Sequence, residues 1–137
     1  MSLTKTKQPF LALSKICLNN WHYIDQKVLS FNDGINFFTG HSGSGKSTVI
    51  DAMQIVLYAN TDGRGFFNKA AADDSDRNLI EYLRGMVAVG EKDEVTYLRN
   101  KNFSTTIVLE FTQTESDEKE CLGVVFDVDT ARNDTSR

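Results

Sequence analysis

The sequence predicts an α/β fold in which an apolar strand, a glycine-rich loop and an apolar helix follow one another beside a mixed or antiparallel sheet. The first observation is the segment INFFTGHSGSGKSTVIDAMQIVLYA, residues 35–59, where three glycines separate a strand-like run from a helical pattern. The second is the last third of the chain, where STTIVLEF and CLGVVFDV alternate as strands do. The polar, acidic stretch TQTESDEKE between them predicts a hairpin.

The N-terminal part predicts a tail and three extended segments. Residues 1–9 are expected to form a disordered tail. In the segment FLALSKICLNNWHYI, residues 10–24, the apolar positions first alternate as in a strand and then slip register, which leaves its assignment ambiguous. Residues 27–31 predict a short strand, and the NDG of residues 32–34 predicts a turn. Residues 35–40 then predict a buried strand.

Two helices are predicted after the glycine loop. The first begins near Ser47 and ends near residues 59–60, where breaker residues follow. The helical spacing predicts one apolar face, made of Val49, Ile50, Met53, Val56 and Leu57. A second, short helix is expected over residues 79–83, ending at Gly85 after a polar loop. The stretch EVTYLRN, residues 94–100, alternates and predicts a further strand.

Composition favours one soluble globular domain. The chain has 137 residues, of which 40% are hydrophobic and 25% charged. No apolar run reaches the length of a membrane span and no secretory signal precedes residue 10, so we expect a cytoplasmic protein. The net charge of −4 argues against an autonomous DNA-binding module. Cys17 and Cys121 lack metal-type spacing to each other or to His22 and His41, so we expect them to be buried small hydrophobes.

The glycine loop fits the pattern G-x-x-x-x-G-K-[ST], with a strand before it and a helix after it. Its glycines let the main chain approach an oxygen atom closely, so that successive N–H groups converge on phosphates. The helix N-terminus adds partial positive charge. Lys46 is placed to reach the β- and γ-phosphates, and the Ser47 hydroxyl is placed to bind Mg²⁺. The predicted nucleotide-binding residues are Gly40, His41, Ser42, Gly43, Ser44, Gly45, Lys46, Ser47 and Thr48.

Phosphoryl transfer also needs a second carboxylate for the metal. Asp127 follows the apolar run LGVVF and is a candidate, which would make the chain a self-contained small P-loop kinase or NTPase. The predicted hairpin argues against this alternative, because such a strand is normally parallel to the strand before the glycine loop. A third alternative is a phosphate-binding scaffold without turnover.

The residues that surround the loop resemble a known family. NNWHYID and LSFNDGINFFTGHSGSGKSTVIDAMQIVLYA resemble the opening of the SMC-like ATPases, in which a strand pair leads into G-x-x-G-x-G-K-S-T-x-I-D-A. The continuation GRGFFNKAAADDSDRNLIEYLRG is similar to the SbcC/MukB-like ATPases of the Wadjet JetC and MksF type. The resemblance covers residues 10–128 and implies that residues 10–137 form the N-terminal lobe of an ABC/SMC-type ATPase head.

The resemblance also implies a ligand, partners and further site residues. ATP and Mg²⁺ are the implied cofactors. A coiled coil, a C-terminal lobe and a second head, as a homodimer, would complete an ATPase that acts on DNA in chromosome organisation or plasmid defence. This lobe alone is then expected to bind nucleotide weakly and to turn it over negligibly. The family places Asn19, Asn20 and Trp21 near the adenine, and Arg64 and Arg77 near phosphate in trans or DNA. Core packing for Trp21 and solvent exposure for the arginines are the alternatives.

Overall fold

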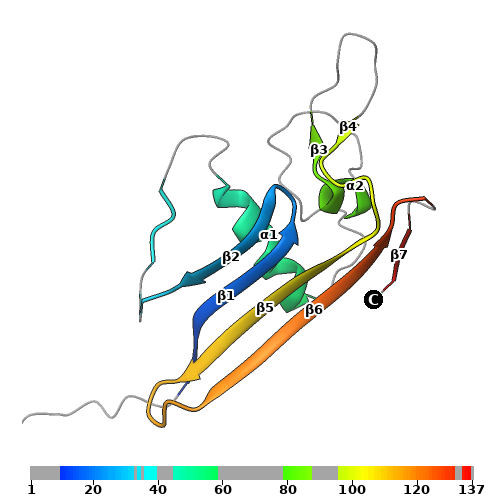
Figure 1. Cartoon of the computed structure of the whole chain (residues 1–137). Helices are drawn as coiled ribbons and strands as arrows, with labels where there is room; N and C mark the ends of the chain where they lie inside the picture. Colours follow the sequence, from blue (N-terminus) through cyan, green and yellow to red (C-terminus); the bar gives the residue numbers. More distant parts are fainter. Residues whose placement is uncertain are drawn as a thin grey trace, which may run out of the picture.

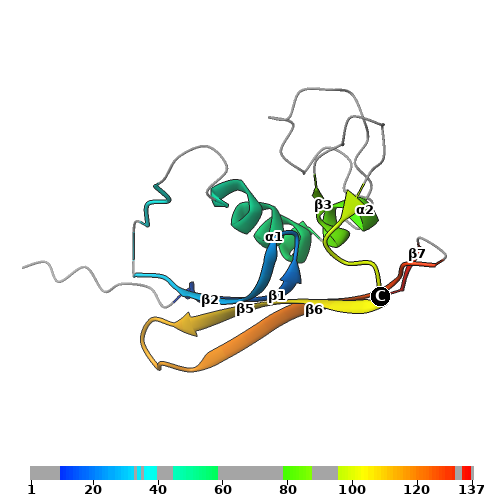
Figure 2. The same cartoon turned by 45° about the horizontal axis from the view of Figure 1, so that its top comes forward.

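Two short helices cover one face of an antiparallel sheet in the computed structural model, which describes residues 10–32, 34, 36–39, 45–58, 79–87, 96–131 and 134–136 (Figures 1 and 2). Five strands form this sheet in the order β2-β1-β5-β6-β7, and all four pairings are antiparallel. In chain order the elements are β1 (Leu11–Trp21), β2 (Ile24–Ser30), α1 (Lys46–Tyr58), α2 (Leu79–Arg84), β3 (Met86–Val87), β4 (Thr96–Tyr97), β5 (Phe103–Gln113), β6 (Lys119–Asp129) and β7 (Asp134–Ser136).

A β-bulge in β1 explains the register slip that made its sequence ambiguous. The pairing with β5 shifts between Leu13 and Lys15, so Ser14 is an extra residue on β1. Its hydroxyl donates to the backbone carbonyl of Glu110 at 3.0 Å. Because one extra residue reverses the alternation, the odd-numbered leucines before the bulge and Ile16 after it lie on the same face. The whole of residues 11–21 is therefore one strand.

The predicted strand at residues 27–31 is confirmed as part of β2, which pairs with β1 from Trp21–Ile24 to Lys15–Ser30. His22 and Tyr23 form the turn between the two strands, and His22 has a φ of 51°. The predicted turn after β2 is also confirmed. Gly34 has a φ of +86°, and the Asn36 side chain bonds the backbone N–H and carbonyl of Asn32 at 2.7 and 3.0 Å.

The prediction of a buried strand at residues 35–40 is wrong for the residues that the structure describes there. Residues 36–39 form no strand, and Phe37 and Phe38 are 84% and 40% exposed. The apolar composition suggested burial, but the Asn36 amide closes a local turn instead. Among the described strands, β2 is the edge strand on its side of the sheet, so none of them covers these phenylalanines.

Helix α1 is confirmed within about one residue of its predicted bounds, but a different face is buried. Val49 and Val56 are buried as predicted, together with Ala52 and Ile55, whereas Ile50 and Leu57 are 41% and 53% exposed. The helix carries apolar residues on two sides, so spacing alone did not decide which side meets the sheet. None of the helices in the described part is long and apolar enough to span a membrane.

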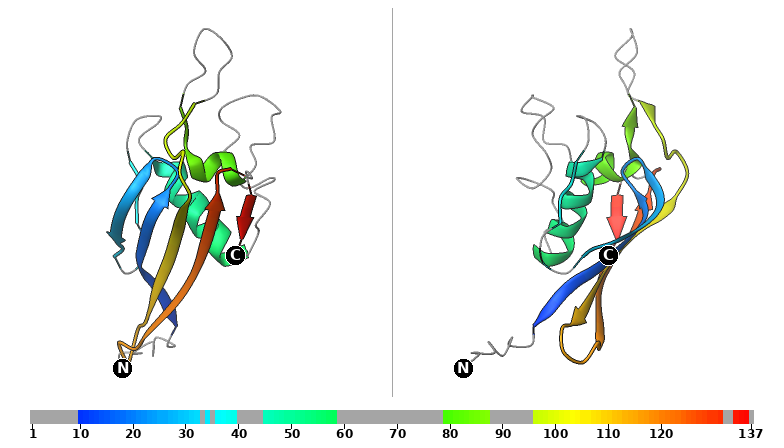
Figure 3. Two further views of the ribbon diagram at one scale, coloured as in Figure 1. Left: turned by 45° about the vertical axis from the view of Figure 1, so that its right-hand side comes forward. Right: turned by 90° about the vertical axis from the view of Figure 1, so that its left-hand side faces the viewer.

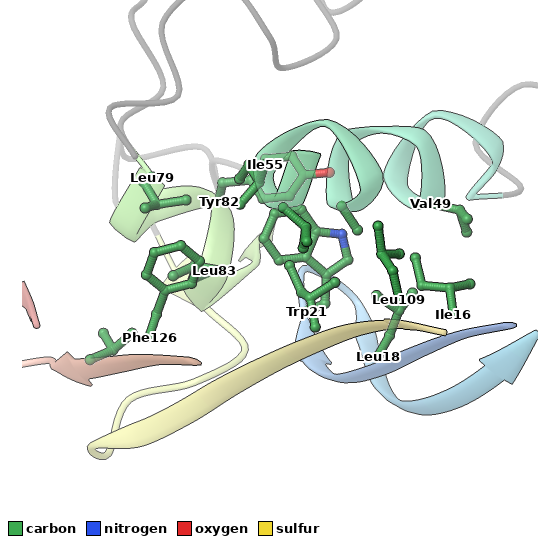
Figure 4. Close-up of a cluster of buried hydrophobic side chains, with 14 residues drawn as sticks. Ile16, Leu18, Trp21, Val49, Ile55, Leu79, Tyr82, Leu83, Leu109 and Phe126 are labelled. Carbon is green, nitrogen blue, oxygen red and sulfur yellow. The ribbon is translucent and has the colours of Figure 1, made fainter. Parts of the chain in front are cut away.

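The core lies between the helices and the sheet (Figures 3 and 4). It is contributed by the inner faces of β1, β5 and β6, by α1 and by α2, which is confirmed at residues 79–84 with Gly85 after it at a φ of +68°. Its buried members are Ile16, Leu18, Trp21, Val49, Ala52, Ile55, Val56, Leu79, Tyr82, Leu83, Ile107, Leu109, Phe126 and Val128.

The predicted hairpin of the last third is confirmed, because β5 and β6 pair antiparallel from Phe103–Val128 to Thr112–Lys119. Of the strand expected at residues 94–100, the structure describes residues 96–100, in which β4 covers Thr96–Tyr97 and pairs with β3 in a separate two-stranded sheet. Cys17 is half-buried, whereas Cys121 is exposed, contrary to the expectation of two buried thiols. Cys121 lies on the face of the sheet opposite to the two helices.

Candidate functional site

The structure describes the helical end of the predicted nucleotide-binding loop. Gly45, Lys46, Ser47 and Thr48 are described, and they connect the loop to α1. The remaining predicted residues lie outside the described part of the chain: Gly40, His41, Ser42, Gly43 and Ser44 in the loop, and Arg64 and Arg77 beyond α1. The geometry of the site is therefore built from the start of α1 and from the residues that hold it.

Gly45 has the backbone conformation that allows the loop to enter the helix. Its φ of +92° lies in the region that favours glycine over every residue with a Cβ. Its carbonyl accepts the N–H of Val49 at 3.2 Å, which closes the first turn of α1. A side chain at residue 45 would strain this entry, so the glycine is required by geometry at the point where the motif places it.

The first turn of α1 favours an anion. A helix N-terminus carries partial positive charge, and natural helices usually place acidic residues there. The first turn of α1 contains no acidic residue and instead contains Lys46. The Ser47 side chain next to it is exposed. Main-chain N–H groups at a helix N-terminus bind anions, so a first turn with a lysine and without an acidic residue fits a phosphate group.

Trp21 is a core residue that supports α1 from beneath. Its side chain is fully buried, and its indole N–H donates to the carbonyl of Thr48 at 2.8 Å. The resemblance placed Trp21 near the adenine, but a buried ring offers no open face on which a base could stack. Core packing, the alternative considered for Trp21, describes its position.

Asn20, another of the three residues suggested to lie near the adenine, also makes structural contacts. It has a φ of 51°, its side-chain amide donates to the carbonyl of Ser104 at 3.0 Å, and its own carbonyl accepts the hydroxyl of Thr105 at 2.7 Å. Asn19 is exposed on β1, where it pairs with Gln26 and Thr106. The contacts of Asn20 thus fasten the end of β1 to β5.

A buried acid in α1 was not among the predicted site residues. Asp51 is 4% exposed, and its carboxylate accepts the hydroxyl of Tyr82 in α2 at 3.0 Å. The Tyr82 ring packs against Trp21, with 4.9 Å between ring centroids, and stacks on His22 at 4.2 Å. The sequence carried a signal for this cluster, namely an aspartate between the apolar residues Ile50 and Ala52.

Asp127, the candidate for a second metal ligand, lies on the wrong face of the sheet. Its neighbours Phe126 and Val128 are buried against the helices, so alternation along β6 directs Asp127 to the opposite face. There it is exposed and accepts the hydroxyl of Ser104. The structure therefore places Asp127 on the face of β6 opposite to the one that packs against the helices, a position that does not favour the small-kinase alternative.

Comparisons with known proteins agree with the interpretation of the glycine loop. Residues 13–74 match the family described as the P-loop containing region of AAA domain. Over 45 residues the chain is 38% identical to the DNA repair protein RecN of Synechocystis. This match covers 33% of the chain, and the chain spans 8% of the length of that relative.

These matches define the class of the segment that carries the loop. The segment resembles the P-loop regions of AAA domains, and the two matches support the predicted resemblance to SMC-like ATPases. The narrower assignment to the JetC or MksF type stays a prediction.

Proposed function

We propose that this chain forms the nucleotide-binding lobe of an SMC-like ATPase head that binds ATP with Mg²⁺ and acts in DNA maintenance. The observation that carries the proposal is the start of α1, where Gly45 enters the helix at a φ of +92° and Lys46 occupies a first turn without acidic residues. The match of residues 13–74 to a P-loop region supports a nucleotide as the ligand. The similarity to a DNA repair protein supports DNA as the substrate of the whole assembly.

In this proposal, main-chain amides from Gly40 to Thr48 bind the phosphates. Lys46 neutralises charge at the β- and γ-phosphates, and the Ser47 hydroxyl is a ligand of Mg²⁺. The exposure of Ser47 fits this role, because a metal ligand at the helix end must be reachable from solvent. When bound, Mg²⁺ would supply charge neutralisation at the phosphates, and the chain would supply binding and orientation.

The proposal includes a second lobe that covers the solvent side of α1. Ile50 and Leu57 are seven residues apart and therefore lie on one side of the helix, where both are exposed. Phe37, 84% exposed, precedes the glycine loop. Exposed apolar groups of this kind are typical of surfaces that pack against another domain. We place there the C-terminal lobe of a longer cytoplasmic protein, whose coiled coil and second head form the working homodimer in chromosome organisation or plasmid defence.

A turnover measurement tests the half-head proposal. The chain of 137 residues is expected to hydrolyse Mg-ATP far below about 1 s⁻¹, the low end of ordinary enzymes, because Asp127, its candidate for a second metal ligand, is exposed on the face of β6 opposite to the buried Phe126 and Val128. Asp127→Asn is the matched variant, and it is expected to leave nucleotide binding unchanged. Turnover at ordinary enzyme rates, abolished by Asp127→Asn, would replace the half-head by a self-contained enzyme.

A further inference from the structure

The buried carboxylate of Asp51 requires an explanation that core packing does not give. It stands at a core-facing position of α1, in the second turn after Lys46, and is 4% exposed. Burying a carboxylate is unfavourable unless hydrogen bonds compensate. The Tyr82 hydroxyl supplies one such bond at 3.0 Å. Losing one partner of such a buried contact leaves the other without its hydrogen bond, and the contact joins α1 to α2.

A second hydrogen bond fixes the same helix one turn earlier. The indole N–H of Trp21 donates to the Thr48 carbonyl at 2.8 Å, and Trp21 is fully buried. The side chains that donate these two hydrogen bonds, Trp21 and Tyr82, pack against each other with their ring centroids 4.9 Å apart (Figure 4). Each rigid aromatic ring therefore restrains the other.

Tyr82 is itself held in place from the sheet. The ring nitrogen Nδ1 of His22 lies 3.1 Å from the Tyr82 carbonyl, which can only accept, so the proton is on that nitrogen. The His22 and Tyr82 rings stack with 14° between their planes. Since His22 forms the turn between β1 and β2, the position of Tyr82 is fixed by the sheet as well as by α2.

We propose that Tyr82 is a positioning residue for the phosphate-binding end of α1, which it holds through its hydrogen bond to Asp51. The inference rests on the proposed function, because it concerns the same nucleotide site. Phosphate binding by main-chain amides depends on the direction of the N–H groups in the first turn. Groups that bind through fixed geometry lose affinity when the supporting contacts loosen.

The test uses the chain of 137 residues and the variants Tyr82→Phe, Asp51→Ala and the double variant. Val128→Ala is the control, because Val128 is 2% exposed in β6 and its truncation lowers stability through packing alone. Two quantities are measured. The first is amide hydrogen exchange in the first turns of α1 without nucleotide. The second is the Kd for Mg-ATP, followed by the fluorescence of Trp21, the single tryptophan of the chain.

Tyr82→Phe is expected to speed amide exchange in α1 and to weaken Mg-ATP binding by about three- to tenfold, the order of one hydrogen bond. The double variant is expected to bind no more weakly than Asp51→Ala, because both changes remove the same contact. Val128→Ala is expected to leave both quantities near wild type under conditions where it is folded. Unchanged exchange and affinity in Tyr82→Phe, or additive losses in the double variant, would overturn the positioning role.

The two readouts also separate this inference from the proposed function. If the wild-type chain and the full-length protein both fail to bind Mg-ATP, the proposed function fails. The exchange data still decide whether Tyr82 and Asp51 hold the start of α1. If the wild type binds and Tyr82→Phe matches it in both measurements, the positioning role fails and the proposed function stands.

Discussion

Arg99 connects the turn between β1 and β2 to the end of α2, and its removal should destabilise the whole fold. The guanidinium donates to the backbone carbonyls of His22, Leu83 and Ile24, at 2.9 Å for Leu83 and 3.2 Å for Ile24. The side chain is 10% exposed. Burial lowers the pKa of Arg99, and the nearby charge of Asp25 opposes that shift. The guanidinium stays charged across the range in which proteins fold.

The expected loss in the free energy of unfolding follows from these contacts. Hydrogen bonds from a charged group contribute about 1.5–3 kcal/mol each in favourable cases, and bonds that share one donor group are not additive. We therefore expect Arg99→Met to lower the free energy of unfolding by about 3 kcal/mol, or roughly 10 °C in Tm. Arg99→Lys should lose less, because an ammonium keeps the charge but lacks the planar fork that reaches several carbonyls.

Asp25→Asn is the matched control. The ion pair between Arg99 and Asp25 spans 3.4 Å, but the Asp25 side chain is 97% exposed, and exposed pairs contribute little, typically below about 1 kcal/mol. Urea denaturation followed by Trp21 fluorescence and by far-UV circular dichroism measures all three variants. If the free energy of unfolding of Arg99→Met lies within about 0.5 kcal/mol of wild type, or if Asp25→Asn loses as much, the hydrogen bonds from Arg99 to the backbone carbonyls do not stabilise the fold.

Two further predictions concern the β5–β6 hairpin. A Cβ added at Gly123 would lie 2.9 Å from the Ile107 carbonyl oxygen, so Gly123→Ala should lower the free energy of unfolding, measured by urea denaturation, by about 1–3 kcal/mol. Cys121→Ala on the same exposed face should lower it by less than about 0.5 kcal/mol. Equal losses in the two variants would contradict the steric argument. Burial by itself raises the pKa of Glu110, but Lys119, the Ser14 hydroxyl and the charge of Lys15 together outweigh it, and the net pKa is lowered. A lowered folded-state pKa stabilises the fold above the ordinary carboxyl pKa and loses that contribution as the pH falls through the folded value. Glu110→Gln should therefore reduce the loss of stability as the pH falls below the ordinary carboxyl pKa, and an unchanged loss would refute this linkage.

Local signals in the sequence were sufficient to predict the two helices and the β5–β6 hairpin. The start of α1 follows from the glycine-to-helix transition at Gly45, and the end of α2 follows from Gly85, whose positive φ ends the helix. The polar link between β5 and β6 predicted their antiparallel pairing, which the structure confirms. These features depend on neighbouring residues, so a pattern of a few positions contains them.

Features that depend on contacts between distant segments were not predictable. The bulge at Ser14 is visible in sequence only as a break in alternation, and its meaning comes from pairing with β5. Phe37 and Phe38 are apolar and exposed, which composition cannot distinguish from a buried strand. The contact of Asp51 with Tyr82 joins residues 31 positions apart across two helices. No spacing rule connects them.

The central claim is that the start of α1 binds the phosphates of a nucleotide, with Lys46 as the cation beside them. Calorimetry with Mg-ATP on the full-length protein measures this directly, comparing wild type with Lys46→Ala and with Lys27→Ala, an exposed lysine of β2. We predict that Lys46→Ala abolishes the heat of binding while Lys27→Ala retains it. Equal binding by wild type and Lys46→Ala would contradict the account.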